Sequence, residues 1–336
     1  MHRSTRTRRV LAASACGVLG ATLAWLPAGP ASASVDAQFS VSANADTNAT
    51  CVLSSGDDSP TSTTATLSSG TAKRSVNLDA TFTSTGNSSD VVQMSGHYTS
   101  AVTVTKKGAN LAKAQMTGAG SVAVSADLGS STACEPKAVV DGFGQMQFTE
   151  AQKGWLYAER TTVNRQGVTE LEVLNNTTDQ GVVVDFFQGR GSHAVSRGFV
   201  QPGTYIAVMA VGLTAGAEPP ILKSPQRTSL NLVFHQAGSA LAGAKGAGKR
   251  YVEFLGAVSC SRHQASLRWT SRAGHVLDGA FLVNGKRQAF DSTPRGGEKI
   301  GLKHLKSTAD LTITAKLRLK GGGSATATRT YVPCKG

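Results

Sequence analysis

Residue types of a catalytic triad occur close together at Asp185, Ser192 and His193. A serine nucleophile needs a histidine base within hydrogen-bonding reach and a third group that orients the base. Neighbouring side chains of a strand point to opposite faces, so Ser192 and His193 cannot meet in this way on one strand. The sequence also lacks the Gly-x-Ser-x-Gly turn of α/β hydrolases. It therefore favours an ordinary polar loop here over serine catalysis.

Two carboxylates, Glu170 and Glu172, share one face of an expected strand. Glycosidases place a carboxylate pair about 5–10 Å apart in a cleft. Because Leu171 and Val173 alternate with the glutamates, both acids are expected on the solvated outer face. Histidines occur singly, and no two cysteines have the CxxC spacing typical of zinc sites. We predict no catalytic residues, no metal site and no cofactor, although a metal site assembled from distant strands stays open.

An aromatic pair, Trp155 and Tyr157, lies on one side of an expected strand. This spacing would suit a stacked saccharide ring. The alternative is that the two rings fill a core that is short of aromatic residues, since large rings dominate sandwich interiors. We favour the core.

Positive charge is concentrated in the last third of the chain. Residues 36–240 carry 13 Lys and Arg against 16 Asp and Glu, whereas residues 241–336 carry 17 against 5. This asymmetry is the most informative electrostatic property of the sequence.

The predicted basic stripe occupies one hairpin of that last third. Alternation over 311–320 places Leu and Ile on one face and basic residues on the other. The returning strand ends at Cys334, and disulfides of small sandwiches usually face the core. Counting back from Cys334 points Thr326, Thr328, Thr330 and Val332 inward and Arg329 outward. The stripe therefore comprises Lys316, Arg318, Lys320 and Arg329.

Such a stripe could bind anionic polymers, for example teichoic acid, acidic polysaccharide or extracellular DNA. Binding of this kind is salt-sensitive and weakly specific. Exposed aromatics between the cations would favour nucleic acid, and the predicted stripe contains none, so sequence-specific nucleic-acid binding is not expected. The alternative role of the cations is solubility or protection of a sheet edge.

Period-two alternation runs through almost every segment after residue 35. Val and Thr recur in these runs, and Gly, Asn, Asp and Ser separate them. β-branched residues fit a pleated sheet, and alternation is typical of half-buried strands. Asn284-Gly285 lies between two such runs, which is the strongest short-range hairpin signal. We predict an all-β chain of two or three serial antiparallel β-sandwich domains, jelly-roll or immunoglobulin-like in type.

We divide the chain at changes in composition. Residues 35–138 are predicted to form a Ser/Thr-rich sandwich, 139–236 a second sandwich, and 251–336 a basic third sandwich. The Gly/Ala/Lys-rich segment 237–250 is predicted to be a flexible linker open to proteolysis. The composition changes little near 138, so a single larger sandwich over 35–236 stays open.

The N-terminal segment has the pattern of a secretory signal peptide. Residues 1–9 contain four arginines and no acid, an apolar stretch follows, and Ala31-Ser32-Ala33 resembles a cleavage site. Residues 1–33 are therefore expected to be removed on export. Arg8-Arg9 leaves both Sec and Tat export open. We expect no transmembrane segment and a secreted or extracellular location, with attachment to the cell wall as one form of it.

Four cysteines remain after that cleavage, namely Cys51, Cys134, Cys260 and Cys334. Four cysteines allow three pairings. Their linear order favours Cys51–Cys134 and Cys260–Cys334, because each pair brackets a strand-rich segment. Closing loops of this size stabilises a fold by about 4 kcal/mol each.

The middle segment, from Trp155 to His235, contains Gln201-Pro202-Gly203-Thr204-Tyr205 before an expected core strand. It resembles the pre-peptidase C-terminal (PPC) family of secreted bacterial proteins, whose jelly-roll-like sandwiches carry such a turn. The resemblance covers under a third of the chain and implies a non-catalytic domain. The last segment looks broadly immunoglobulin-like, and the chain as a whole is similar in style to secreted actinobacterial proteins.

Our leading hypothesis is a secreted, non-catalytic binding protein. It would attach to an anionic cell-envelope or extracellular polymer, or mediate an interaction with an extracellular protein. Two alternatives stay open: a secreted enzyme with an unrecognised site in 35–236, and a secreted protease inhibitor or assembly subunit.

Overall fold

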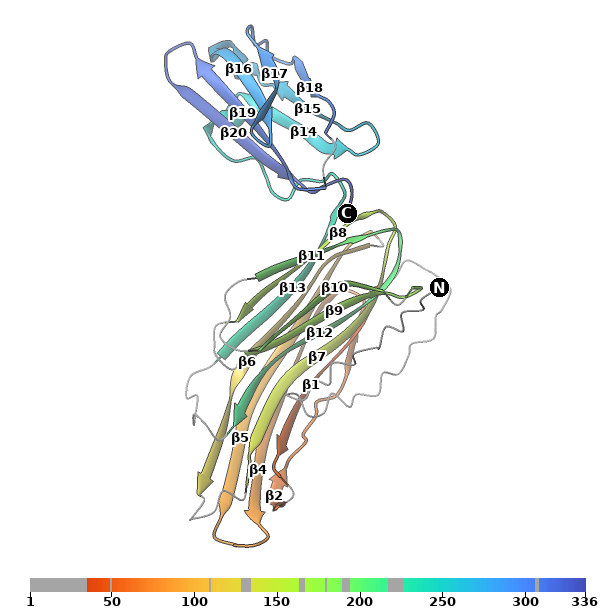
Figure 1. Cartoon of the computed structure of the whole chain (residues 1–336), viewed down its shortest axis with the longest axis vertical. Coiled ribbons are helices and arrows are strands. Elements are labelled where there is room, and N and C mark those ends of the chain that lie inside the picture. Colours follow the sequence, from red (N-terminus) through yellow and green to blue (C-terminus); the bar gives the residue numbers. More distant parts are fainter. Residues whose placement is uncertain are drawn as a thin grey trace, which may run out of the picture.

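The computed structural model describes residues 35–48, 50–108, 110–127, 134–162, 167–178, 180–188, 194–216, 226–305 and 308–336. The expected signal peptide and the Ser192-His193 pair lie outside the described residues. The described chain is all-β, with antiparallel strands in four sheets that form sandwiches (Figure 1). Two short 3-10 helices, η1 (Ala247–Arg250) and η2 (Ser271–His275), accompany the strands.

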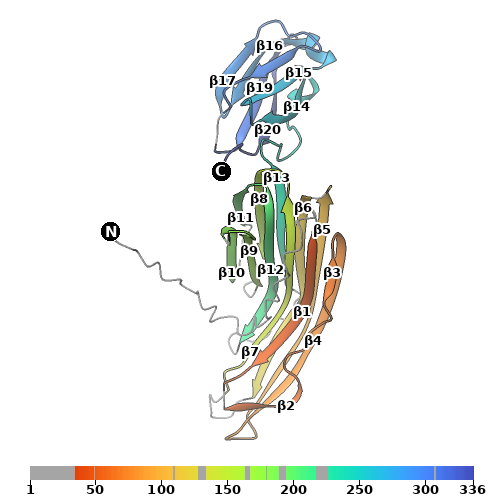
Figure 2. The same cartoon turned by 90° about the vertical axis from the view of Figure 1, so that its right-hand side faces the viewer.

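Two large sheets form the N-terminal sandwich, and Figure 2 shows them as two curved layers. The six-stranded sheet has the order β10-β9-β12-β7-β1-β3. Its strands are β1 (Asp36–Asp46), β3 (Ala65–Leu67), β7 (Lys137–Glu150), β9 (Gly167–Asn175), β10 (Gly181–Gln188) and β12 (Gly203–Gly216). The seven-stranded sheet has the order β11-β8-β13-β6-β5-β4-β2. Its strands are β2 (Cys51–Asp57), β4 (Gly70–Ser84), β5 (Val91–Lys107), β6 (Asn110–Asp127), β8 (Gly154–Thr162), β11 (Ala194–Val200) and β13 (Gln226–Gln236).

The predicted segments 35–138 and 139–236 do not form separate sandwiches. Strand β7 runs across the expected boundary, and its residues 137–147 pair with the whole length of β1. Strand β6 pairs with β13 in the other sheet, and one core cluster extends from Val35 to Leu232. The single larger sandwich, which the composition left open, is the arrangement found. Alternation reveals which residues form strands, but it does not identify the partner strands.

The core of this sandwich follows the alternation closely. In β7 the residues from Ala138 to Phe148 alternate between buried and half-buried positions. Tyr98 is completely buried, and its hydroxyl donates a hydrogen bond to the carbonyl oxygen of Val211, 2.9 Å away. Gly118 makes room for this ring, because a Cβ at that position would lie 1.7 Å from the Tyr98 hydroxyl oxygen.

The C-terminal sandwich is smaller and has its own core around Trp269 and Phe281. Its three-stranded sheet contains β14 (Val252–Ser259), β15 (Gln264–Trp269) and β18 (Lys299–Leu302). Its four-stranded sheet, in the order β17-β16-β19-β20, contains β16 (Val276–Val283), β17 (Lys286–Asp291), β19 (Leu311–Leu319) and β20 (Ser324–Tyr331). Asn284 and Gly285 both adopt positive φ angles, 47° and 80°, as the predicted hairpin turn requires.

The segment 237–250 differs from the flexible linker expected from its composition. Lys245 and Thr328 exchange two backbone hydrogen bonds, of 2.9 Å and 3.0 Å, and Ala240 forms a bridge with Tyr331. The segment then enters η1. Glycine and alanine give flexibility only where the backbone has no partner, and here the edge of β20 supplies one. The segment is therefore part of the C-terminal sandwich.

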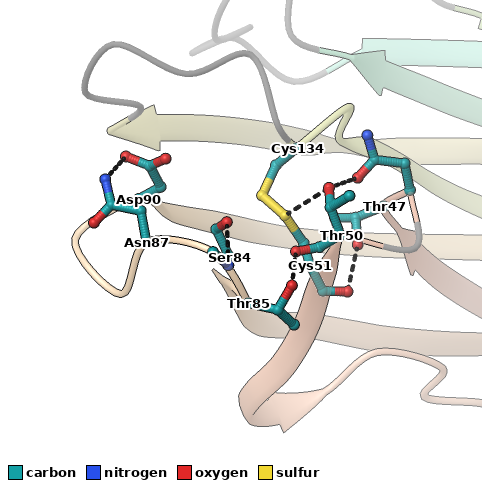
Figure 3. Close-up of a disulfide and its surroundings, with 10 residues drawn as sticks. Thr47, Thr50, Cys51, Ser84, Thr85, Asn87, Asp90 and Cys134 are labelled. Atoms are coloured by element: carbon teal, nitrogen blue, oxygen red, sulfur yellow. Dashed lines mark hydrogen bonds between the residues drawn. A yellow bond between two sulfur atoms is a disulfide. The ribbon is translucent and has the colours of Figure 1, made fainter.

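Both predicted disulfides are confirmed. Cys51 and Cys134 have Cα atoms 5.8 Å apart, and those of Cys260 and Cys334 lie 5.2 Å apart. Figure 3 shows the first bridge, with the Thr50 hydroxyl beside the Cys51 sulfur. None of the helices in the described part of the chain could span a bilayer.

Candidate functional site: the outer face of the C-terminal four-stranded sheet

The predicted basic stripe lies on the outer face of the sheet β17-β16-β19-β20. Alternation in β19 buries Leu311, Ile313, Ala315 and Leu317 and leaves Lys316 and Arg318 exposed. Lys316 lies between Ala280 of β16 and Thr326 of β20 in the register of the sheet. Lys320 follows the end of β19 and is also exposed. Three of the four predicted residues are therefore solvent-accessible cations of one hairpin.

Arg318 is an ion-paired member of this group. Its guanidinium donates hydrogen bonds to Asp278, 2.9 Å and 2.8 Å from the Nε atom to the two carboxylate oxygens. This bonding, together with the guanidinium charge, holds the pKa of Asp278 below its usual range. Asp278 faces outward because a register shift in β16 separates it from Val276. The pair leaves little net charge at this position.

Arg329 does not join the stripe. In β20 the buried residues are Ala325, Ala327 and Tyr331. Because side chains alternate along a strand, Arg329 lies on the same inward-facing side as these residues and not on the outer face. The prediction counted back from Cys334, which is buried as expected. However, β20 ends at Tyr331, and the strand alternation does not continue to Cys334.

The threonines of β20 show the same reversal of phase. Thr328 and Thr330 were expected to point inward, but both face outward. Their hydroxyl oxygens lie 3.4 Å and 3.2 Å from those of Thr314 and Thr312 across the strand pair. Thr326, also expected inward, is exposed beside Lys316.

The guanidinium of Arg329 has a structural role. It donates hydrogen bonds to the carbonyl oxygens of Ala242, at 3.3 Å, and Phe254, at 3.1 Å. The same group lies 5.6 Å from the centroid of the Tyr331 ring. Arg329 therefore ties the segment 237–250 to β14 instead of facing a ligand.

Phe290 is an exposed aromatic residue that the sequence analysis did not place on this face. Phe290 is 54% exposed, and the register of the sheet places it in one row with Ala280 and Lys316. The guanidinium carbon of Arg287 lies 6.0 Å from its ring centroid. The sequence signal for Phe290 was the alternating run 286–290 after the Asn-Gly turn. However, a bulge near Phe281 and Leu282 decides which side chains of this run face outward.

We call this surface the basic face and define it by Arg287, Phe290, Lys316, Arg318 and Lys320. Leu282 and Ala280 form a half-buried apolar floor between its cations. An apolar floor and ring bordered by cations can contact the carbon skeleton and the charged group of one ligand at the same time.

Most acids of the C-terminal sandwich are already engaged by specific partners. Glu253 pairs with Arg268, Asp278 with Arg318, and Asp310 with Arg197 of the other sandwich. Asp291 accepts a 2.6 Å hydrogen bond from the Trp269 indole. Four of the five acids in 241–336 therefore already have a partner, and none of these partners is Arg287, Lys316 or Lys320.

Trp155 lies at the junction between the two sandwiches. It is 7% exposed, and its indole nitrogen donates a 2.9 Å hydrogen bond to the carbonyl oxygen of Pro333. Its ring makes an edge contact with Phe199, and Tyr157 makes one with His235. The aromatic pair is thus neither a sugar platform nor part of the main core: it forms a joint between domains.

Arg197 completes this joint. Its guanidinium pairs with Asp310 of the C-terminal sandwich and donates a 3.2 Å hydrogen bond to the Tyr157 hydroxyl. It also lies 4.8 Å from the Trp155 ring centroid. Burial opposes its charge, but the bonds to Tyr157 and Asp310 raise the pKa of Arg197 above its usual value.

The remaining carboxylates do not converge on a catalytic centre in the part of the chain described. Glu170 and Glu172 alternate with the buried Leu171 and Val173 and lie on the outer face of β9, as predicted, but both are half-buried and not fully solvated. Burial, and then the charge of Glu172, raise the pKa of Glu170. In the described residues, no group of three or more His, Cys, Asp or Glu is arranged to hold a metal ion.

Comparisons with known proteins give only distant likenesses. No family model and no curated protein matches the chain. The chain is similar to a GH2 beta-galacturonidase from Eisenbergiella tayi bound to galacturonate, at 13% identity and a TM-score of 0.18, over 56% of this chain and 35% of that chain. It is also similar to a Paenibacillus xanthan lyase, at 9% identity and a TM-score of 0.19, over 77% of this chain and 39% of that chain.

This chain therefore spans well under half the length of either enzyme. Likeness at this level assigns neither a family nor an activity to it. The resemblances of 155–235 to the PPC family and of the last segment to immunoglobulin-like domains stay predictions.

Proposed function

We propose that the chain is a secreted, non-catalytic binding protein that attaches to an anionic polymer of the cell envelope or the extracellular space. The basic face of the C-terminal sandwich is the attachment surface. The observation that supports this most is the row Phe290, Ala280, Lys316, with Arg287 beside the ring. Cations and an apolar surface lie side by side in this row. The neighbouring acid, Asp278, is already paired with Arg318 and does not neutralise them.

Electrostatics supplies the attraction, and the apolar floor supplies contact. A net positive sheet face draws a polyanion over roughly 10 Å at moderate ionic strength, and added salt screens that attraction. Phe290 and Leu282 then cover carbon atoms of the polymer. A single exposed ring does not offer the series of stacking positions typical of proteins that bind single-stranded nucleic acid. The proposal therefore concerns wall polymers such as teichoic acid or acidic polysaccharide.

The test compares matched charge removals in the mature chain from residue 34. Binding to purified teichoic-acid-bearing cell wall is measured in a salt series for the parent, for Arg287→Gln/Lys316→Gln, and for Arg262→Gln/Lys299→Gln. The last variant removes the same charge from exposed positions away from the basic face. The basic-face variant should bind the cell wall at least about tenfold more weakly than the parent. The binding of the control variant should change little.

Two outcomes contradict the proposal. No binding of the parent at low salt would remove the attachment function. Equal weakening in both variants would show that overall charge acts instead of this surface. A third variant, Phe290→Ser, keeps every charge and should still reduce binding if the ring contacts the polymer.

A further inference from the structure

A second surface of interest lies on the N-terminal sandwich. A groove of about 490 Å³ opens on the outer face of the seven-stranded sheet, over β4, β5, β6, β13 and β8. These strands lie side by side in Figure 1. Its lining includes Lys73, Thr99, Ala101, Thr117, Ala119 and Arg227.

The register of the sheet explains why this surface is hollow. Lys73 of β4 and Arg227 of β13 stand on either side of the strand pair β5 and β6. Between them the outward positions hold only small side chains: Ala101 and Thr117 in one row, and Thr99 and Ala119 in the next. Three strand spacings separate β4 from β13, which is about 14 Å. The two long cations therefore border a floor of methyl and hydroxyl groups.

The groove has a positive electrostatic character. Lys73 and Arg227 are both exposed, and no carboxylate is among the lining residues described. Neither cation has an ion pair with another described residue. The neighbouring Arg74 is directed elsewhere, since its Nε atom donates a 2.9 Å hydrogen bond to the carbonyl oxygen of Thr63.

We propose that this groove binds a short anionic saccharide, in which ring hydroxyls accompany a carboxylate or a sulfate ester. Thr99 and Thr117 offer hydroxyls that donate to and accept from sugar hydroxyls. Ala101 and Ala119 offer methyl groups to the C–H faces of the rings. Lys73 and Arg227 bind the acidic substituent through charge-assisted hydrogen bonds. This site is separate from the basic face and does not depend on the function proposed for it.

Two other ligand classes fit the groove less well. Nucleic-acid bases bind by stacking on aromatic rings, and none lines the groove in the described residues. An extended peptide adds to a free sheet edge, but β5 and β6 both have strand partners on each side.

The test is calorimetric titration of the mature chain with three tetrasaccharides at low salt. A hyaluronan tetrasaccharide carries carboxylates, a heparin tetrasaccharide carries carboxylates and sulfates, and chitotetraose is neutral. The acidic probes should bind and chitotetraose should not. A comparison of the two acidic probes distinguishes carboxylate from sulfate recognition.

Variants then locate the binding. Lys73→Gln/Arg227→Gln should weaken the binding of the acidic tetrasaccharide by about tenfold for each cation. Lys107→Gln/Lys153→Gln removes the same charge from exposed positions outside the groove and should leave the affinity unchanged. Ala101→Phe fills the groove from its floor and keeps both cations, so it should abolish binding.

Several results would overturn the proposal: no binding of either acidic probe, equal binding of chitotetraose, or full affinity in Ala101→Phe. Loss of saccharide binding in Arg287→Gln/Lys316→Gln, with normal affinity in Lys73→Gln/Arg227→Gln, would transfer the site to the basic face. Circular dichroism of each variant checks that the sandwich is intact.

Discussion

The indole nitrogen of Trp155 lies 2.9 Å from the carbonyl oxygen of Pro333, although the two residues are 178 positions apart in the sequence. This bond joins β8 of the large sandwich to the residue directly before Cys334. Because Cys334 is fixed by its disulfide to Cys260, the bridge also fixes the acceptor of the Trp155 bond. The joint between the sandwiches thus depends on a covalent bond inside one of them.

We expect loss of the C-terminal disulfide to loosen this joint. The variant Cys260→Ser/Cys334→Ser should destabilise the C-terminal sandwich by about 4 kcal/mol, because the unfolded segment regains its loop entropy. Hydrogen exchange of the Trp155 indole N–H, followed by NMR, should become faster.

The matched control for the joint is Cys51→Ser/Cys134→Ser. It removes the other bridge and should leave the Trp155 exchange rate at the parent value. Unchanged exchange in the Cys260/Cys334 variant would mean that the Pro333 carbonyl is held by other contacts.

The Arg197–Asp310 pair should contribute a small, salt-dependent coupling. Both side chains are about one-third exposed, 33% and 38%, so solvent screens their attraction. A double-mutant cycle of Arg197→Gln and Asp310→Asn, measured by thermal unfolding, should give about 0.2–1 kcal/mol. A coupling that does not fall with added salt would point to packing against Trp155 and not to charge.

Gly118 is the position in the large sandwich where a methyl group should be least tolerated. Gly118→Ala should destabilise the fold by about 1–3 kcal/mol, because the new Cβ meets the Tyr98 ring and hydroxyl. The control Gly216→Ala meets nothing closer than a carbonyl oxygen at 3.7 Å and should have little effect. Urea midpoints measure both. Tyr98→Phe should partly rescue Gly118→Ala, and absence of any rescue would contradict the assigned clash.

Glu150 should make stability fall as the pH rises. Burial raises its pKa to about 8 in the folded chain, whereas an unfolded glutamate has a pKa of 4.5. The folded state therefore holds the proton more tightly, and stability is lost progressively between pH 4.5 and about 8. Glu150→Gln should flatten the urea midpoint across this range, while the exposed Glu135→Gln should retain the parent slope. Parallel profiles for the parent and Glu150→Gln would contradict this role.

Local sequence patterns predicted the local structure well. The all-β class, the Asn284-Gly285 hairpin and both disulfides are confirmed. Each depends on neighbouring residues or on linear order: alternation, a turn that needs positive φ, and cysteines that bracket a segment.

The pairing of the strands, and which side chains of a strand face inward, could not be predicted in the same way. One partner of β7 is β1, about 100 residues earlier, and alternation carries no information about partners. The orientation of Arg329 required knowing that β20 ends at Tyr331, because counting from Cys334 reversed the phase. Phe290 was missed because a bulge near Phe281 and Leu282 shifts the pattern.

In the part of the chain that the structure describes, the C-terminal sandwich contacts its neighbour at one end. Its first and last segments meet there, where the Val332 N–H donates to the Ser239 carbonyl and Trp155 holds Pro333. If the basic face is anchored to an immobile polymer, tension in the molecule would act at once on the Trp155 bond and the Arg197–Asp310 pair, which lie beside the covalent chain at Ala237. Parallel loading of this kind shares mechanical force between the weak bonds, which would then break together instead of one by one.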